Sequence, residues 1–308
     1  MKNHLSKKLT ASLLALLLVV LQTGCVDLAG LRKFTDESVK AGSKFKDLAA
    51  DNYRSCASQL YYLEVRGGNF DSIKIFESPD IFLATLPADR RGICTEVKDA
   101  SVNFIGANKI LMTYLYVMGQ LAGDSVASTD KQFEEFRTAL EGLPGNRPPE
   151  ISAALSIANT ITNILIDAQR QKAIKKALRE TDESVEALTE GLARYLTVYV
   201  TRLENEREEI KRMFAFAHRH QMAAPNPSAN ALLVVSSSAK LDADVQRINS
   251  KINAAKAYQK ALSGIRDGHR ELYDLAGRGF NKKVALQIAL KYGPAIQENY
   301  EEIVKAFE

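Results

Sequence analysis

The chain has 308 residues, with 41 lysine and arginine residues against 37 aspartate and glutamate residues. Three of the positive charges, on Lys2, Lys7 and Lys8, lie within the first eight residues. The rest of the chain is therefore almost neutral. It gives no ground for nucleic-acid binding, which requires a dense basic face.

The first 24 residues have the pattern of an export signal. The three lysines form a positively charged start, and a short apolar core follows at residues 13–21. This core is too short to cross a bilayer, which takes about 20 apolar residues. We therefore expect residues 1–24 to be a cleaved signal peptide and residues 25–308 to be the mature chain.

The end of this signal carries a recognisable motif. Residues 21–25, which read LQTGC, resemble the lipobox of bacterial lipoproteins, in which small residues precede a cysteine that becomes acylated. Gln22 departs from the pattern, because that family usually has leucine three residues before the cysteine. The resemblance implies a lipid on Cys25, and Val26 in place of aspartate favours the outer membrane. The alternative is an ordinary cleaved signal that releases the protein and leaves Cys25 as a thiol.

Cys56 and Cys94 are the other two cysteines of the chain. If the protein is exported, both thiols lie in an oxidising compartment, where paired cysteines form disulfides. We expect a disulfide between them, which would close a loop of about 38 residues and contribute about 3 to 4 kcal/mol of stability. The alternative is two buried free thiols.

The first half of the body is predicted to be mostly helical. Apolar residues recur at spacings of about three and four in residues 31–63, which indicates a helix with one buried face. Residues 67–92 lose this period, and we expect a structured segment there that leaves the main helical body and contains a short helix or strand. The disulfide would join the two ends of this segment. Residues 102–121 are apolar almost all round, which is typical of a central bundle helix or a membrane span. Lys109, with its polar and glycine neighbours, favours the buried helix.

The second half of the body predicts long helices. Residues 149–221 contain no proline after their first position, and their apolar positions recur near every 3.6 residues, which would give a helix about 100 Å long if unbroken. A break is expected at residues 181–184, where capping residue types cluster. A turn at residues 224–227 precedes another helix over residues 231–276, and so short a connection predicts an antiparallel hairpin.

The chain closes with a helical stretch at residues 282–307, in which Pro294 predicts a kink. No internal repeat and no linker divides the body. These elements together predict an all-α fold, an elongated helical bundle with a long antiparallel helical hairpin, in a single domain.

Three of the four histidines lie outside the predicted signal. His218 and His220 lie two residues apart on a predicted helix and cannot chelate one ion as an i, i+4 pair could, so we expect a surface pair. His269 falls on the apolar stripe between Ile265 and Leu272. We expect a buried imidazole that has a hydrogen-bond partner and fixes the packing register, with a role as a ligand or pH sensor as the alternative.

Two runs of opposite charge adjoin in the long helical stretch. Residues 170–179 are rich in lysine and arginine, and residues 180–190 are rich in aspartate and glutamate. Such runs usually form solvated faces or pair with an adjacent helix. The alternative is a charged patch for phospholipid headgroups or peptidoglycan.

The sequence contains no motif for nucleotide, dinucleotide or zinc binding or for serine hydrolysis, and it predicts no cofactor and no metal site. Long helices form few clefts, which favours a non-enzymatic role. We therefore expect a lipid-anchored binding or scaffold protein of the cell envelope, with a protein partner bound along the hairpin or at its tip, residues 225–230. One alternative is a membrane-active protein that inserts residues 102–121 and 153–168. Another is an envelope enzyme with an unrecognised site.

Overall fold

The computed structural model describes residues 28–67, 78–123, 138, 141, 149–164, 170–222, 227–278 and 282–307. The elements within these ranges are all α-helices, which confirms the all-α prediction. The predicted signal peptide and Cys25 lie outside the described residues.

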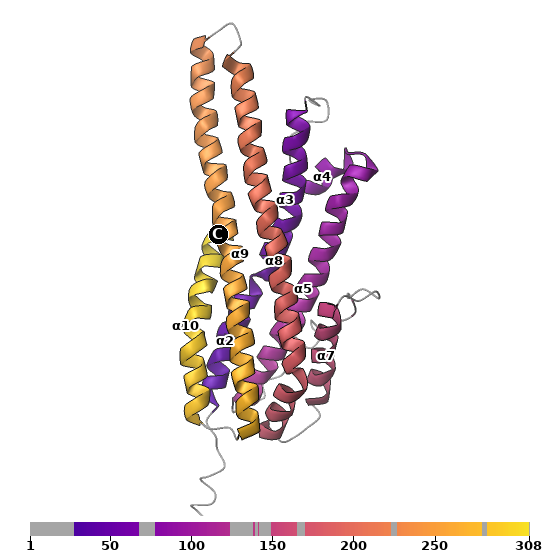
Figure 1. Cartoon of the computed structure of the whole chain (residues 1–308), viewed down its shortest axis with the longest axis vertical. Helices are drawn as coiled ribbons and strands as arrows, with labels where there is room; N and C mark the ends of the chain where they lie inside the picture. The colour runs from indigo at the N-terminus through magenta and orange to yellow at the C-terminus, as the bar shows by residue number, and fades with distance from the viewer. Residues whose placement is uncertain are drawn as a thin grey trace, which may run out of the picture.

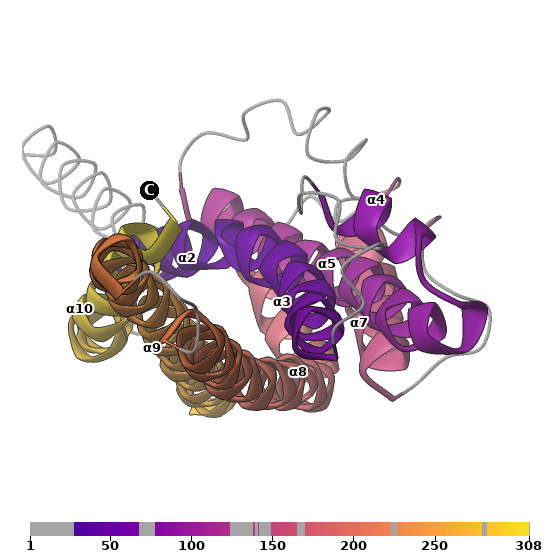
Figure 2. The ribbon, with the colours of Figure 1, turned by 90° about the horizontal axis from the view of Figure 1, so that it is seen from above.

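The helices pack side by side into an elongated bundle (Figure 1). Helices α2 (Ala29–Ser43) and α3 (Phe45–Arg66) follow one another along its length, and α5 (Ala88–Ala122) returns beside them. Helices α7 (Pro149–Ile164), α8 (Arg170–Met222), α9 (Pro227–Arg278) and α10 (Lys282–Phe307) complete it. Figure 2 shows α8, α9 and α10 as neighbours along one side, with α3 packed against α8.

Helices α8 and α9 form the predicted long antiparallel hairpin. They contain 53 and 52 residues, which corresponds to a length of about 80 Å for each. Their facing stripes are fully buried, for example at Leu192 and Tyr199 of α8 and at Ile252 and Leu262 of α9. Both helices project beyond the end of α3, so the far part of the hairpin is an arm of two helices (Figure 1).

The predicted break at residues 181–184 is wrong, because α8 runs through it. The side chains that could have capped a new helix serve packing instead. The hydroxyl of Thr181 donates to the carbonyl of Ala177 one turn earlier, at 2.8 Å. Asp182 is buried against α9, where it pairs with Arg270 at 2.6 Å.

Helices α7 and α8 are separate and antiparallel rather than one continuous helix. The guanidinium of Arg194, in the middle of α8, donates to the carboxylate of Glu150, at the start of α7, at 2.7 Å. The chain must therefore reverse between the two helices, and residues 165–169, which join them, lie outside the described part.

Helix α5 is only partly the buried central helix that the sequence predicts. It begins earlier, at Ala88, and its buried residues are concentrated between Ala107 and Gly119. Val102, at the start of the apolar stretch, is 56% exposed. Among the described helices, none combines the length and the apolar character needed to cross a membrane.

The predicted disulfide between Cys56 and Cys94 is present and joins α3 to α5, with the two Cα atoms 5.7 Å apart. It lies in a small hydrophobic cluster with Phe82 and Leu83 of α4 (Pro79–Ala84). This helix is the short element expected in the excursion, while residues 68–77 lie outside the described part. A second, much larger hydrophobic core extends through α2, α3, α5 and α7 to α10.

The start of α2 is fixed at one end of the bundle by a close approach to α10. A Cβ atom at Gly30 would collide with the backbone of Ala285 and Leu286, so only glycine allows this contact. Helix α10 starts there and runs through Pro294 without ending. The start of α2 therefore lies at one end of the molecule, and the end of α8 and the start of α9 lie at the other (Figure 1).

Candidate functional site

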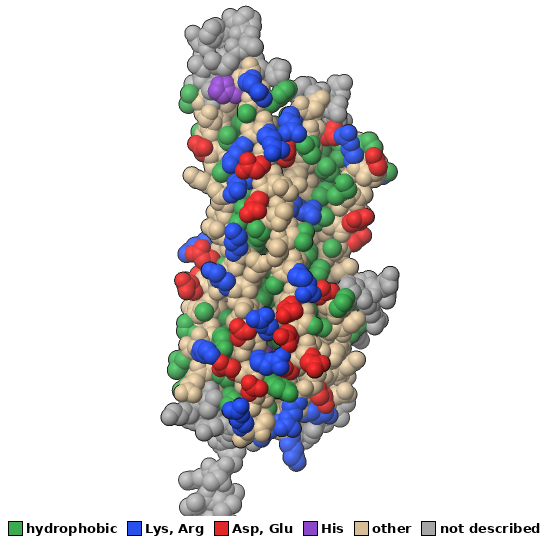
Figure 3. All heavy atoms as spheres, in the orientation of Figure 1, with side chains coloured by type: hydrophobic (Ala, Val, Ile, Leu, Met, Phe, Trp, Pro, Cys, Tyr) green, Lys and Arg blue, Asp and Glu red, His purple; other side chains and the backbone are tan. Residues whose placement is uncertain are grey.

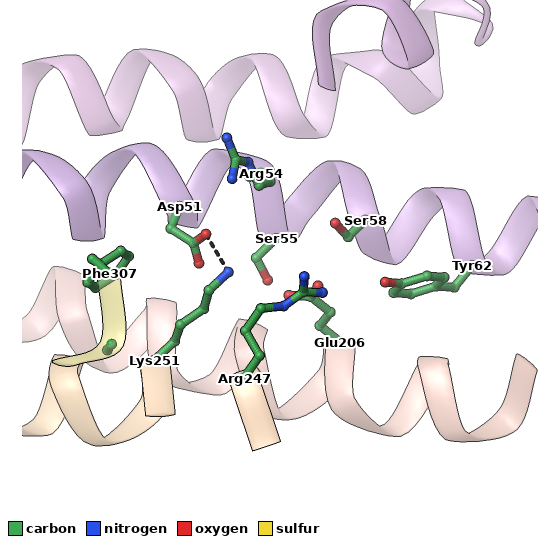
Figure 4. Close-up of a pocket in the computed structure, with 10 residues that line it drawn as sticks. Asp51, Arg54, Ser55, Ser58, Tyr62, Glu206, Arg247, Lys251 and Phe307 are labelled. Carbon is green, nitrogen blue, oxygen red and sulfur yellow. Dashed lines mark hydrogen bonds and ion pairs between the residues drawn. The ribbon is translucent and has the colours of Figure 1, made fainter. Parts of the chain in front are cut away.

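A polar cavity of about 480 Å³ lies between α3, α8, α9 and the last turn of α10 (Figure 4). Its size falls within the range of small-molecule binding sites. The residues that line it include five ionisable side chains, two serines and two aromatic rings: Asp51, Arg54, Ser55, Ser58, Tyr62, Glu206, Arg247, Lys251, Ala306 and Phe307.

The helices bring these residues together through their turn spacing. Asp51, Ser55 and Ser58 follow one another at intervals of four and three residues, so they share one face of α3. Arg247 and Lys251 are one turn apart on α9, and both extend toward α3 (Figure 4). Three rigid helices therefore hold the lining side chains in place.

The Asp51 carboxylate is the centre of a buried network at one end of the cavity. It accepts a hydrogen bond from the Lys251 ammonium at 2.6 Å and another from the Tyr199 hydroxyl at 2.6 Å. Burial and the neighbouring Asp51 raise the pKa of Tyr199, which keeps its hydroxyl protonated as a donor. The network joins α3, α8 and α9, and within it the positive charge of Lys251 is paired with the negative charge of Asp51.

Glu206 of α8 is different, because its carboxyl group is buried without an ion pair. The residue is 5% exposed, and among the described residues no basic side chain forms a salt bridge with it. Burial raises the pKa of Glu206, and a hydrogen bond from Ser55, together with the positive charges of Lys251 and Arg247, offsets this rise only in part. Ser55 is itself buried. The carboxyl group is therefore held by a neutral hydroxyl group and not by a salt bridge.

The mouth of the cavity is basic and partly aromatic. Arg54 is exposed and forms no ion pair with a described residue. Arg247 is also exposed, and its guanidinium binds Asp244 at 2.8 Å outside the cavity. Burial raises the pKa of Tyr62, so its hydroxyl is a donor at neutral pH. Phe307 supplies an apolar wall from the end of α10.

This arrangement can hold a polar ligand by charge and by hydrogen bonds. The Lys251 amine is already bound to Asp51, and no histidine lines the cavity. Within the described ranges, no group of histidine, cysteine, aspartate and glutamate side chains could hold a metal ion. What the cavity offers is charge, hydrogen-bond donors and a desolvated carboxyl group.

A second hollow of about 410 Å³ lies between α3, α5 and α8 beside the disulfide. Its lining is largely apolar and includes the exposed side chains of Ile93 and Val198. It lacks a buried carboxylate, so the cavity around Glu206 is the stronger candidate for a specific site.

His269 lies apart from both cavities, buried between α9, α5 and α8. Its Nε2 atom lies 2.8 Å from the Tyr114 hydroxyl, and its Nδ1 atom lies 3.3 Å from the Asp182 carboxylate. The predicted buried, hydrogen-bonded imidazole is therefore confirmed. His218 is exposed near the end of α8, as predicted, while the side chain of His220 lies outside the described part.

The two charged runs behave differently. The acidic run pairs with α9, since Arg270 contacts both Asp182 at 2.6 Å and Glu186 at 2.5 Å. This confirms the expectation of pairing with an adjacent helix. In the basic run, Lys172 and Lys175 form no ion pair with a described residue. Figure 3 shows basic side chains gathered at the end of the molecule where α8 begins.

The sequence interpretation missed the cavity residues. A local signal was present, because Asp51, Ser55 and Ser58 place polar groups beside the apolar stripe of α3. What the pattern could not show is that Lys251, which is 200 positions from Asp51 in the chain, would meet it.

The chain matches no known protein family, and no curated protein or solved structure shows significant similarity to it. Its function must therefore be inferred from its own residues and geometry.

Proposed function

We propose that this chain is a lipoprotein of the bacterial cell envelope that binds a small polar ligand in the Glu206 cavity without catalysing a reaction. The observation that carries the proposal is the cavity itself, in which rigid helices bury a carboxyl group that has no ion pair. Buried polar groups reduce stability unless they find partners. A positively charged group of a ligand that enters the cavity would supply Glu206 with the ion pair that it lacks.

The position of Cys25 supports an anchored orientation. It precedes residue 28 by three positions, and α2, which follows, starts at the end of the bundle opposite the end of α8. Two or more acyl chains on this cysteine would hold the protein stably to a membrane. Lys172 and Lys175 belong to the first two turns of α8, which begins at the same end of the molecule, and they would contact anionic headgroups. The hairpin would then point away from the membrane.

In this orientation the cavity lies clear of the bilayer. Phe307, which lines it, ends α10 about halfway along the molecule in Figure 1. The cavity would face the aqueous space of the envelope, where small polar solutes can reach it. This position agrees with a role in capturing a dissolved or headgroup-borne ligand.

The anchor is tested by Cys25→Ala and membrane fractionation. The unaltered protein should stay in the membrane pellet after a high-salt wash, because acyl chains hold it by hydrophobic burial. The variant should leave the pellet in that wash. A variant that stayed bound at high salt would contradict the lipid anchor.

The cavity is tested by native mass spectrometry of the protein purified from membranes in mild detergent. We expect a small-molecule adduct that Ala306→Trp removes, because the indole would fill the cavity from the last turn of α10. Ala239→Trp, at an exposed position on the arm, is the matched control and should keep the adduct. An adduct that survived Ala306→Trp would place the ligand elsewhere.

A protein partner on the projecting arm of α8 and α9 is a second proposal. Val235, on the arm, is 68% exposed, the highest value among the large apolar side chains of the described residues. A photocrosslinker at this position should capture one partner in intact cells, and the same group at Val102 should not. We do not extend the proposal to membrane insertion, because residues 107–119 of α5 contribute to the core.

A further inference from the structure

The charged groups around the cavity include one acidic and one basic side chain that form no salt bridge with a described residue. Asp51 and Lys251 neutralise each other at 2.6 Å. Arg247 is bound to Asp244. This leaves Glu206 inside the cavity and Arg54 at its mouth, neither of which forms a salt bridge with a described residue.

Ligands of a single charge fit this arrangement poorly. A purely anionic molecule would be attracted by Arg54 and Arg247 at the mouth but repelled by Glu206 once inside. A purely cationic molecule would have to pass two guanidinium groups to reach Glu206. Because a desolvated site strengthens both attraction and repulsion, these mismatches would weaken binding strongly.

A molecule that carries both charges satisfies both groups. A primary ammonium can donate charge-assisted hydrogen bonds to a buried carboxylate, and these are among the strongest in proteins. Guanidinium groups bind carboxylate and phosphate oxygens in a planar, two-pronged geometry. The ring of Phe307 and the side chain of Ala306 would contact the carbon atoms between the two charges.

We propose that the ligand is a small zwitterion, with a primary ammonium group that binds Glu206 and a carboxylate or phosphate group that binds Arg54 and Arg247. Amino acids, short peptides and aminoalkyl phosphates have this chemistry. The inference rests on the proposed ligand-binding function and names the ligand class for the same cavity. The hydroxyl groups of Ser55 and Ser58 would complete the hydrogen bonds to the ammonium end.

The test is isothermal titration calorimetry of the full-length lipidated protein in detergent, after dialysis to remove bound ligand. Glycylglycine is the carboxylate zwitterion, and O-phosphoethanolamine is the phosphate zwitterion. N-acetylglycine carries the acid alone, and ethanolamine carries the amine alone. At least one zwitterion should bind about tenfold or more tightly than either singly charged probe. The stronger of the two zwitterions identifies the acidic group as carboxylate or phosphate.

Variants separate the two ends of the ligand. Glu206→Gln should weaken zwitterion binding about tenfold or more and should strengthen binding of N-acetylglycine, because the repulsion inside the cavity is removed. Arg54→Gln should weaken the binding of the zwitterions and of N-acetylglycine. Glu208→Gln alters an exposed glutamate on α8 that pairs with Lys211, and it should leave the affinity for the zwitterions and for N-acetylglycine unchanged.

The outcomes distinguish this inference from the function on which it rests. A small-molecule adduct in native mass spectrometry, together with zwitterions that bind no better than ethanolamine or N-acetylglycine, would overturn only the ligand class. The absence of both an adduct and any titration heat would overturn the ligand-binding function as well. An unchanged zwitterion affinity in Glu206→Gln would overturn the role of Glu206.

Discussion

The Nε2 atom of His269 on α9 lies 2.8 Å from the hydroxyl oxygen of Tyr114 on α5. On the other side of the ring, Nδ1 faces Asp182, whose second oxygen binds Arg270 at 2.6 Å. Thr181 lies 2.9 Å from the Tyr114 hydroxyl. The imidazole thus joins three helices of the core, and its protonation is coupled to their packing.

This coupling predicts a pH dependence of stability. Burial lowers the pKa of His269 below its usual value, although Asp182 opposes the change. The unfolded chain therefore binds a proton more readily than the folded protein just below pH 6.5, about the usual histidine pKa, so this contribution to stability falls as the pH drops there.

The contribution of His269 is measured as a difference between proteins, because Glu206 titrates in the opposite sense. His269→Gln should reduce the free energy of unfolding by about 1 to 3 kcal/mol at pH 7.5. The gap from the unaltered protein should shrink as the pH falls from 7.5 to 5 in urea unfolding. His218→Gln, at an exposed position, should show no gap at either pH. A gap that widened on acidification would contradict the assignment.

The disulfide should stabilise α4 and its attachment to the bundle. Its two cysteines are 38 positions apart, and a loop of this size corresponds to about 3 to 4 kcal/mol in the chain-entropy model. Cys56→Ala with Cys94→Ala should lower the melting temperature by several degrees. A reductant should lower it similarly in the unaltered protein and leave the double variant unchanged. Melting that did not respond to reductant would contradict a stabilising role.

Two glycines offer a matched test of the α2–α10 contact. Gly30→Ala places a methyl group against the backbone of Ala285, and the shift needed to admit it should cost about 1 to 3 kcal/mol. Gly92 lies within α5 with open space around it. Gly92→Ala should therefore stabilise the protein by about 0.5 to 1 kcal/mol, as alanine favours helices. Circular dichroism during urea unfolding measures both, and equal effects would contradict the close contact.

The long helices could be predicted because each buries one face, and burial of one face repeats every 3.6 residues in the sequence. This is why the α8–α9 hairpin followed from its apolar positions. The break at residues 181–184 was wrong for a related reason. Thr181 and Asp182 are capping residue types, but here their partners are Tyr114, His269 and Arg270 on other helices. Local helix propensity carries no information about partners on other helices.

The candidate site could not be predicted from the sequence for the same physical reason. Asp51 and Lys251 meet only because α3 and α9 pack near each other, and no spacing in the sequence records that contact. Glu206 is one of many glutamates on α8, and its burial follows from the position of α3 beside it. The disulfide was predictable because a single pairing of Cys56 and Cys94 remained once Cys25 was set aside.

The last prediction concerns the basic end of the bundle. Lys172 and Lys175 lie in the first two turns of α8, at the same end as residue 28. Each basic residue near an anionic membrane contributes about 1 kcal/mol of attraction. The chain from residue 25 with Cys25→Ser, which cannot carry the proposed acyl group, should therefore bind weakly to vesicles that contain anionic phospholipids and should dissociate at high salt.

Charge reversal at each end tests the orientation. Lys172→Glu with Lys175→Glu, in the Cys25→Ser background, should lower vesicle binding about tenfold or more, because two attractions become repulsions. Arg212→Glu with Lys240→Glu makes the same change in net charge on the arm, at exposed positions far from residue 28. Vesicle cosedimentation should show a much smaller loss for this pair. Equal losses would mean that net charge alone governs binding. The proposed orientation, in which the start of α8 faces the membrane and the hairpin points away from it, would then have no electrostatic support.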